Sequence, residues 1–584
     1  MKEQWMLKNP KADFEHIKQK FNVSGLLAYL LAGRDLKTDE EIEAYLNPTK
    51  DSMHSWKLFK DMGKAVRMVK KAIDNGQKIC VVGDYDCDGI CSVSILVSGL
   101  RSLGGFVSYI IPDRIADGYG LNCSMVDKAA ESGTDLIITC DNGIAATEAV
   151  AYAKELGMDV VVTDHHNVPE NNDLKADAIV DPKQEDCAYP YEGICGAVVA
   201  AKLMEGLYTE YDFGSFIEKN YDLMALATVV DVMELKDENR FIVKEGLKSL
   251  NNSTRIGINA LKNATGISGK ELGVYHLGFI LGPCLNSSGR LETADMAVEM
   301  LLSEDENEAA GFAVKLKELN DSRKNMTEQA KVKGVELIEN SELKEDNILV
   351  LLMPDLHESL AGIVAGRIKE EFNRPAIVFT EAAGDDSILK GSGRSVEEYD
   401  IYKGVDAIRE MTVKFGGHPM ACGLSIRRDM LESFRTRLNE NCEKDLKNME
   451  KKIMIDVSIP MSSFSPAVLE EIKKLEPCGN GNPGPVFADR MTVTGVRRFG
   501  KEGQYLTISG RDGRGFAINE LKSFEESFFS AYEEYFGRDE AGKLQKNLGD
   551  KVVNIIYKPQ INEYMGNTSM QYILKKYSFP KKEV

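Results

Sequence analysis

The sequence lacks several features that mark large classes of protein. Its 584 residues include 11 cysteines but no C-x-x-C pair, so neither a disulfide framework nor a structural zinc site is expected. No apolar run approaches the roughly 20 residues of a membrane helix. Residues 1–22 carry charges throughout and have no signal-like apolar core. These absences predict a soluble protein of the reducing cytoplasm with no membrane partner.

Basic residues are also in short supply. The chain has 72 Lys and Arg against 92 Asp and Glu, a formal net charge of −20, which by itself argues against a nucleic-acid-binding protein. The deficit is uneven, because residues 451–584 contain 20 basic and 17 acidic residues whereas the other 450 residues contain 52 and 75. The net charge therefore does not exclude a nucleic-acid ligand. It predicts binding that is confined to a groove and sensitive to salt.

Hydrophobic periodicity divides the chain into five segments. Between about 77 and 182, short apolar runs such as Ile79–Val82 and Leu136–Thr139 alternate with helical stretches, which predicts βαβ units and a mostly parallel sheet. A smaller α/β pattern begins near 346, and short alternating runs from about 451 predict a small all-β barrel. The expected segments are an N-terminal helical segment (1–70), a first α/β domain (71–300), a connecting helix (301–345), a second α/β domain (346–445) and the barrel (446–584).

The densest cluster of chemically active residues follows the first predicted strand of the sheet. In Gly83–Gly89, GDYDCDG, the carboxylates Asp84, Asp86 and Asp88 alternate, and an extended backbone would place them on one side. Three carboxylates so close repel one another, and a bound cation relieves that repulsion. An EF-hand loop also begins DxDxDG, but its twelfth position would be Ile95 rather than a glutamate, and a strand precedes it. A solvated acidic loop is the alternative without a function.

Acidic and imidazole side chains also follow later apolar runs. Asp141 ends one predicted strand, and Asp231 ends an apolar run further along the chain. Asp164, His165 and His166 end a strand between these two. The carboxyl ends of parallel strands meet at one edge of a sheet, where ligands bind. Carboxylates with one imidazole suit hard or borderline ions such as Mn²⁺ or Mg²⁺ and differ from a cysteine-rich zinc site. A shared carboxylate could hold two ions about 3.5–4 Å apart for phosphoryl displacement. The residues favour a dinuclear metal hydrolase.

Several motifs resemble those of the DHH phosphoesterase superfamily and, within it, the family of single-stranded-DNA-specific exonucleases. The metal-binding motifs are GDYDCDG, TCDNG and TDHH, with the later Asp231. The resemblance covers about residues 70–580, and its motifs together are far more specific than any one of them. The further matches are Gly282–Leu291 (GPCLNSSGRL), Ala361–Arg367 (AGIVAGR), Gly391–Ser395 (GSGRS), Phe415–His418 (FGGH) and Leu475–Pro483 (LEPCGNGNP).

The resemblance implies a fold and an activity. The implied fold is a parallel-sheet DHH domain, a smaller DHH-associated α/β domain joined to it by a long helix, and a C-terminal oligonucleotide-binding (OB) barrel. The implied activity is metal-dependent degradation of single-stranded DNA from the 5′ end to 5′-mononucleotides, in DNA repair and recombination. Two Mn²⁺ or Mg²⁺ ions would serve as cofactors. Single-strand-binding protein and a helicase are the implied protein partners.

Carried over residue by residue, the resemblance also implies roles. The implied metal ligands are Asp84, Asp86, Asp88, Asp141 as the bridge, His165 and Asp231. The implied catalytic residues are Asp141, Asp164, which orients the histidine pair, and His166 and His418, which face the reacting phosphate. The implied substrate contacts are Asn286, Arg290, Arg367, Ser392, Gly393, Arg394, Ser395, Gly416 and Gly417.

Some of these contacts have ordinary structural alternatives. Gly391–Ser395 would combine exposed backbone amides with the Arg394 guanidinium, a pairing suited to phosphate. Arg290 and Arg367 are as compatible with structural ion pairs as with phosphate contacts. The residues Leu356-His357-Glu358-Ser359 depart from the Trp-His and Pro-Gly pairs usual in the family, which leaves strand contacts and substrate preference there open.

Two other functions remain open. The nearer is a DHH-family phosphodiesterase that acts on short oligonucleotides, cyclic dinucleotides or pyrophosphate, which would not need the barrel. The other is a non-catalytic nucleic-acid-binding scaffold. The complete set Asp86, Asp88, Asp141, His165 and Asp231 argues against the scaffold, because a non-catalytic protein has no need of all five.

Overall fold

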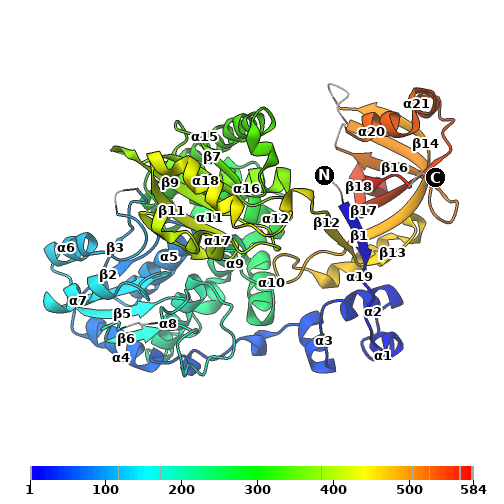
Figure 1. Ribbon diagram of the computed structural model, residues 1–584. Helices are drawn as coiled ribbons and strands as arrows, with labels where there is room; N and C mark the ends of the chain where they lie inside the picture. Colours follow the sequence, from blue (N-terminus) through cyan, green and yellow to red (C-terminus); the bar gives the residue numbers. More distant parts are fainter. Residues whose placement is uncertain are drawn as a thin grey trace. The chain divides into compact units, whose positions relative to one another are not determined.

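The chain forms two compact units in the computed structural model, which describes residues 3–115, 117–170, 173–382, 384–500, 505–524, 527–564 and 567–580 (Figure 1). The first unit comprises Thr49–Lys451 and Gly479–Gly481. The second comprises Glu3–Pro48, Lys452–Cys478 and Asn482–Val584. Among the described residues, no helix is both long enough and apolar enough to cross a membrane.

A five-stranded parallel sheet in the order β3-β2-β4-β5-β6 forms the centre of the first unit. Neighbouring residues of β2 face opposite sides: Ile79 packs with helices α4, α5 and α8, and Cys80 packs with α6 and α7. The predicted parallel sheet is confirmed, and helices cover both of its faces. The elements are α4 (Met62–Asp74), β2 (Lys78–Val82), α5 (Cys87–Ser102), β3 (Phe106–Ile110), α6 (Cys123–Glu131), β4 (Leu136–Cys140), α7 (Thr147–Glu155), β5 (Asp159–Thr163), β6 (Ala178–Val180) and α8 (Gly196–Glu210).

A helical region follows the sheet and ends in one long helix, α15. This helix has 34 residues, which at 1.5 Å per residue makes it about 50 Å long. The Asp305 side chain caps its first turn by accepting from the backbone N–H groups of Asn307 and Glu308. The elements are α9 (Tyr221–Val230), α10 (Asp237–Asn251), α11 (Ile256–Ala264), α12 (Val274–His276), a π-helical turn (Leu277–Leu281), α13 (Gly282–Leu291), α14 (Asp295–Leu302) and α15 (Glu306–Glu339).

The second α/β domain contains a mixed sheet in the order β10-β11-β9-β8-β7. Strands β7 and β8 are parallel, and the other neighbours are antiparallel. Strand β9 lies inside the sheet, so its backbone hydrogen-bonding groups are paired on both sides. Strand β10 lies at the edge, where one side of its backbone is unpaired within the sheet. The elements are β7 (Leu349–Leu352), α16 (Ala361–Phe372), β8 (Ala376–Ala382), β9 (Asp385–Arg394), α17 (Ile401–Asp406), β10 (Lys414–His418), β11 (Ala421–Arg427) and α18 (Leu431–Glu440).

The C-terminal region forms the predicted closed barrel. Its strands follow the order β14-β15-β16-β18-β17, and pairing of β17 with β14 closes the ring. The barrel is not purely β, because α20 and α21 lie between β16 and β17 and bury Phe528, Tyr532 and Leu544 in its core. The elements are β13 (Val457–Ser458), α19 (Pro466–Ile472), β14 (Phe487–Phe499), β15 (Tyr505–Arg511), β16 (Ala517–Ser523), α20 (Ser527–Phe536), α21 (Arg538–Gln545), β17 (Lys551–Tyr564) and β18 (Asn567–Ser578).

Within the predicted N-terminal segment, residues 3–48 and 49–70 pack into different cores, so the described part of it is not one structural unit. Leu27 and Leu31 of α2 are fully buried in the same core as Met461 and Leu469 of the second unit, whereas α4 packs on the parallel sheet of the first. Helical periodicity shows that a helix has an apolar face but does not show which core receives it. The elements are β1 (Glu3–Leu7), which pairs with β12 (Lys451–Ile455), α1 (Phe14–Lys20), α2 (Gly25–Ala32) and α3 (Asp39–Leu46).

Candidate metal centre and adjoining cleft

The acidic loop after β2 folds differently from the extended segment that its alternating carboxylates predicted. Asp86 is the N-cap of α5, and its Oδ1 accepts the backbone N–H groups of Asp88 and Gly89 at 3.0 and 3.1 Å. Asp88 therefore lies in the first turn of a helix. A Cβ atom on Gly89 would lie 2.4 Å from the Asp84 carbonyl oxygen, so the close approach of this turn to Asp84 requires glycine.

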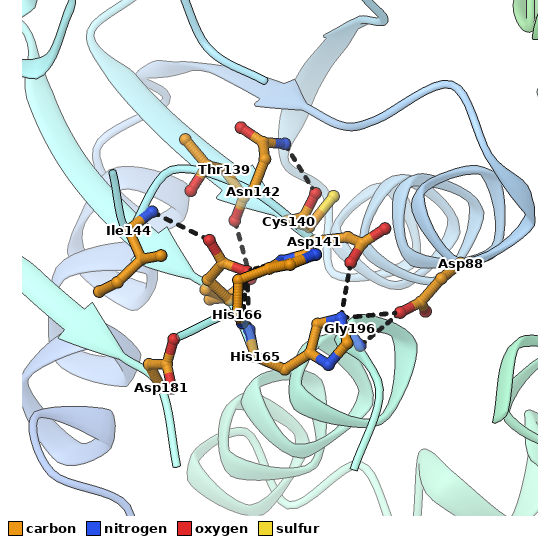
Figure 2. A network of polar contacts seen from close by, with 12 residues as sticks. Asp88, Thr139, Cys140, Asp141, Asn142, Ile144, His165, His166, Asp181 and Gly196 are labelled. Carbon is orange, nitrogen blue, oxygen red and sulfur yellow. Dashed lines mark hydrogen bonds and ion pairs between the residues drawn. The ribbon is translucent and has the colours of Figure 1, made fainter. Parts of the chain in front are cut away.

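Asp88 is held by the N-terminus of a second helix. Its two carboxylate oxygens accept the backbone N–H groups of Gly196 at 2.6 Å and Ala197 at 2.7 Å, at the start of α8 (Figure 2). A Cβ atom on Gly196 would lie 2.7 Å from Cβ of Asp141. The absence of a side chain at position 196 thus lets Asp88 and Asp141 approach each other across the first turn of α8.

Asp141 has a backbone conformation that is uncommon for a residue with a side chain. Its φ of 61° lies in the left-handed region. The next residue fixes the turn, because the Asn142 amide donates to the carbonyl groups of Val82 at 3.1 Å and Cys140 at 2.9 Å. The Oδ1 atom of Asp141 is buried and has no hydrogen-bond partner. This turn presents an unpartnered carboxylate oxygen at the carboxyl edge of the sheet.

The two histidines after β5 have different surroundings. Nε2 of His165 lies 3.0 Å from Oδ1 of Asp141 and 3.5 Å from Oδ2 of Asp88, and both ring nitrogens are buried without a hydrogen bond. His166 is hydrogen-bonded through Nδ1 to Oδ1 of Asp164 at 2.7 Å and through Nε2 to the Tyr119 hydroxyl at 3.0 Å. His165 is available as a metal ligand, and His166 is oriented by its neighbours.

Asp164 is the anchor of this turn. Its Oδ1 accepts the backbone N–H groups of His165 at 2.7 Å and His166 at 3.2 Å, and its Oδ2 accepts that of Ile144 at 2.9 Å. Burial would raise the pKa of Asp164, but the bond and the charge of His166 outweigh burial and lower it. The carboxylate is therefore ionised and holds both histidines in place.

Asp231 reaches the same edge of the sheet from the end of α9. Its Oδ2 lies 3.8 Å from Nε2 of His165. Burial and the charges of Asp88 and Asp86 raise the pKa of Asp231 to about 8. The next residue, Val232, has a φ of 59°, an outlier for a β-branched side chain. Such strain is often found beside functional groups, and here it lies directly after a candidate ligand.

The side chains at this edge fit divalent metal ions. Three overlapping sets of ligand atoms lie within 4.8 Å of one another: Asp84, Asp86 and Asp141 form one, Asp88, His165 and Asp231 form the second, and Asp141, His165 and His166 form the third. Burial and mutual repulsion raise the pKa values of Asp84, Asp88 and Asp141. Buried carboxylate and imidazole atoms without hydrogen-bond partners are unstable without a cation. Carboxylates with a single imidazole match Mn²⁺ or Mg²⁺.

A cleft of about 760 Å³ adjoins this centre. Tyr85, which lies between two candidate ligands, and Tyr119 line one wall. Lys390 and Ser392 on β9 line the opposite wall, which the second α/β domain supplies. The guanidinium of Arg114 lies 4.7 Å from the centre of the Tyr85 ring, a cation–π contact at the boundary between metal centre and cleft.

Three arginines converge near the cleft. Arg290 is partly buried and donates to the Ser359 carbonyl at 2.8 Å, and desolvation together with repulsion from Arg114 lowers its pKa to about 10. Burial and Arg114 also lower the pKa of Arg394. A Cβ atom on Gly362 would lie 2.7 Å from a terminal nitrogen of Arg394, so the guanidinium abuts the start of α16. Partly buried guanidiniums that repel one another favour the binding of an anion.

Other predicted substrate residues have partners within the protein. The expectation of exposed backbone amides in Gly391–Ser395 is wrong for β9, because β8 and β11 pair with it on both sides. Asn286 accepts the backbone N–H of Cys87 at 2.7 Å, which supports the acidic loop. Arg367 is in an ion pair with Glu328. The hydroxyl of Ser395 donates to the Tyr399 carbonyl.

Gly416, Gly417 and His418 lie on the edge strand β10 and are exposed. Gly417 has a φ of 151°, and a Cβ atom there would lie 2.4 Å from the Ala421 carbonyl oxygen, so the hairpin of β10 and β11 requires glycine at this point. Gly416 lines the cleft, and His418 lies beyond it at the tip of the strand.

Sequence reasoning missed several residues of the site. Arg114 and Tyr119 lie in the loop between β3 and α6, where no motif or periodicity marks them. Asp181 could have been found, because it is another acid directly after a strand. It is fully buried, its Oδ2 has no hydrogen-bond partner, and burial raises its pKa to about 7.

Comparisons with known proteins agree with this architecture. Models of three families match in chain order: the N-terminal domain of the DHH family (residues 78–228), the DHHA1 domain (345–444) and the RecJ OB domain (455–576). The chain is 33% identical to the single-stranded-DNA-specific exonuclease RecJ of Salmonella typhimurium over 98% of this chain and 99% of that protein. It is 32% identical to RecJ of Bacillus subtilis over 98% and 70%. The crystal structure of Thermus thermophilus RecJ in complex with Mn²⁺ superposes with a TM-score of 0.81 at 25% identity, over 99% of this chain and 80% of that one.

Proposed function

Because this chain belongs to the RecJ family of single-stranded-DNA-specific exonucleases, we propose that it releases 5′-mononucleotides from the 5′ end of single-stranded DNA. The chain is a metal-dependent nuclease with a DHH domain, a DHHA1 domain and an OB barrel. The observation that carries the proposal is the set of buried, unpartnered ligand atoms beside a cleft with basic walls. We expect this activity to serve in DNA repair and recombination.

Six side chains would hold the two metal ions. Asp84, Asp86 and Asp141 would bind one ion, and Asp88, His165 and Asp231 the other. Asp141, whose Oδ1 lies 3.0 Å from His165, is the candidate to bridge the two sets. When bound, Mn²⁺ or Mg²⁺ would polarise the scissile phosphate and activate water for its hydrolysis.

His166 would donate a hydrogen bond from Nε2 to the scissile phosphate, which would replace the Tyr119 hydroxyl as the partner of that atom. Burial alone would lower its pKa, but the bond to Asp164 and that residue's charge raise the pKa of His166 to about 9. The ring is therefore cationic at neutral pH, and Asp164 and Tyr119 fix its direction. A positioned cation stabilises the charge that develops on phosphate oxygens. His418, exposed at the tip of β10, would be a second donor.

The remaining substrate contacts would come from the cleft and the barrel. Arg114, Arg290 and Arg394, together with the Ser392 hydroxyl, would bind phosphate groups near the strand end. The barrel would bind the strand farther from its end by stacking and backbone contacts. We expect the enzyme to act in the cytoplasm on strands exposed by a helicase or covered by single-strand-binding protein.

Digestion of end-labelled DNA tests the proposal. Single strands labelled at either the 5′ or the 3′ end are incubated with the protein and Mn²⁺, beside duplex, dinucleotide and cyclic dinucleotide substrates. Immediate release of the label as a mononucleotide from 5′-labelled single strands is the expected result. Release from 3′-labelled strands first would refute the polarity. Turnover of dinucleotides alone would instead identify a short-oligonucleotide phosphodiesterase.

A further inference from the structure

The cleft beside the metal centre has basic walls and contains one acid. Its charged lining residues are Arg114, Lys390, Arg409, Lys414 and Glu358, so Glu358 is the single carboxylate among the described residues that line it. A cleft that binds phosphate groups has no electrostatic use for a carboxylate. The position of Glu358 therefore calls for an explanation in terms of the substrate.

An ion pair with Lys390 holds the Glu358 carboxylate in the cleft. Lys390 places its Nζ atom 3.2 and 3.0 Å from the two oxygens of the Glu358 carboxylate, whose side chain is 16% exposed. The adjacent Ser359 carbonyl accepts the hydrogen bond from Arg290. Lys390 is followed on β9 by Ser392 two residues later, on the same wall of the cleft. The carboxylate is thus tied to the cleft and does not swing free in solvent.

This ion pair changes the relative affinity of the cleft for a phosphate or a hydroxyl group at the end of a strand. The ion pair neutralises Lys390, which would otherwise attract phosphate. A terminal phosphate carries close to two negative charges at neutral pH, and Glu358 repels it. A terminal hydroxyl carries no charge and can donate a hydrogen bond to the carboxylate. Partial burial strengthens both effects relative to water.

We propose that Glu358 is a specificity-determining residue that shifts the enzyme's preference from a phosphorylated strand end towards a hydroxyl end. The proposal rests on the proposed function, because it requires that the cleft receive the end of a single strand. It extends that function by assigning the chemical state of the substrate's terminus. Lys390 is the positioning residue through which part of the effect acts.

The substitution Glu358→Gln tests the proposal. Binding of two single strands of one sequence, with either a 5′-phosphate or a 5′-hydroxyl, is measured by fluorescence anisotropy with Ca²⁺ in place of Mn²⁺. We expect the ratio of the two affinities to move roughly tenfold towards the phosphorylated strand, the effect of removing one nearby charge. The ratio is independent of the fraction of folded protein, so partial misfolding does not obscure it. An unchanged ratio overturns the proposal.

Two further variants sharpen the result. Lys390→Gln leaves Glu358 unpaired and should move the ratio towards the hydroxyl strand; a shift in the same direction as Glu358→Gln would contradict the proposal. The control is Glu432→Gln, an exposed acid of the same domain that pairs with Arg435 outside the cleft and should leave the ratio unchanged. Wild-type protein that neither binds nor digests single strands overturns both this inference and the proposed function. Wild-type digestion with an unchanged ratio in Glu358→Gln overturns this inference alone.

Discussion

Nε2 of His165 and Oδ1 of Asp141 lie 3.0 Å apart, yet neither atom takes part in a hydrogen bond. Both are buried, and they come from the ends of neighbouring strands, β5 and β4. Two polar atoms held at this distance without bonding each other point to a third partner between or beside them. This relationship makes Asp141 the residue on which the metal centre depends most.

Replacing Asp141 with asparagine should lower the Mn²⁺-dependent rate on single strands by at least about a thousandfold, because the charge that joins the two ligand sets is lost. The metal-free protein should melt at the same temperature or higher, because one charge leaves a repulsive cluster. Asparagine tolerates the left-handed φ of 61° well, so the backbone is retained. Rate assays and thermal unfolding check both parts. A near-wild-type rate would contradict the bridging role.

Binding of Mn²⁺ should release protons, because Asp231 has a pKa of about 8 in the metal-free protein and is largely protonated at pH 7. Titration calorimetry in buffers of different ionisation enthalpy measures the number released. The variant Asp231→Asn should release about one proton fewer. Equal proton release by the two proteins would show that Asp231 does not give up a proton when the metal binds.

The raised pKa of the Asp231 carboxyl group also predicts how the stability of the metal-free protein depends on pH. Its folded pKa is raised above the unfolded value, so its contribution to metal-free stability is full below about pH 4 and is lost progressively as the pH rises to about 8. The melting temperature of the metal-free protein should therefore fall across this range by more than that of Asp231→Asn. Saturation with Mn²⁺ should reduce the difference.

Much of the fold and of the metal centre was predictable because the signals are local. Val81 and Ile138 belong to short apolar runs that are long enough for buried strands, and Asp141 and Asp164 directly follow such runs. Strand ends of a parallel sheet converge wherever the strands pair, so the meeting of these carboxylates did not depend on details of packing.

The residues that sequence reasoning missed or misjudged depend on distant partners. Gly391–Ser395 resembles a phosphate-binding loop locally, but its pairing with β8 and β11 removes the exposed amides. Asp88 is oriented by Gly196, which is 108 positions later in the chain. Arg114 lies in an irregular loop, and only its position in the lining of the cleft marks it as a candidate substrate contact. Periodicity contains no information on such long-range contacts.

The substitution Gly196→Ala should weaken metal binding without unfolding the protein. The added Cβ atom would lie 2.7 Å from Cβ of Asp141 and must displace either that side chain or the start of α8, which also holds Asp88. Disturbing a group that orients metal ligands typically costs about 10–100-fold in affinity. Manganese titration followed by thermal unfolding checks this expectation. Gly311→Ala, on α15 with nothing within 4 Å of the added atom, is the matched control and should bind Mn²⁺ as the wild type does.

A chain truncated to residues 49–450 should cleave dinucleotides at close to the wild-type rate but bind long single strands more weakly, because it keeps the metal centre and the cleft and loses the barrel.

The residue at which the truncated chain begins also affects its solubility. Residues 3–48 belong to the second unit, and Leu27, Leu30 and Leu31 are buried there to within 1% of full burial. A chain of residues 1–450 would expose these side chains and should aggregate more readily than 49–450. Light scattering compares the two truncations, and strand-length dependence of cleavage compares each with the intact protein. Unchanged affinity of 49–450 for long strands would show that the barrel does not bind DNA.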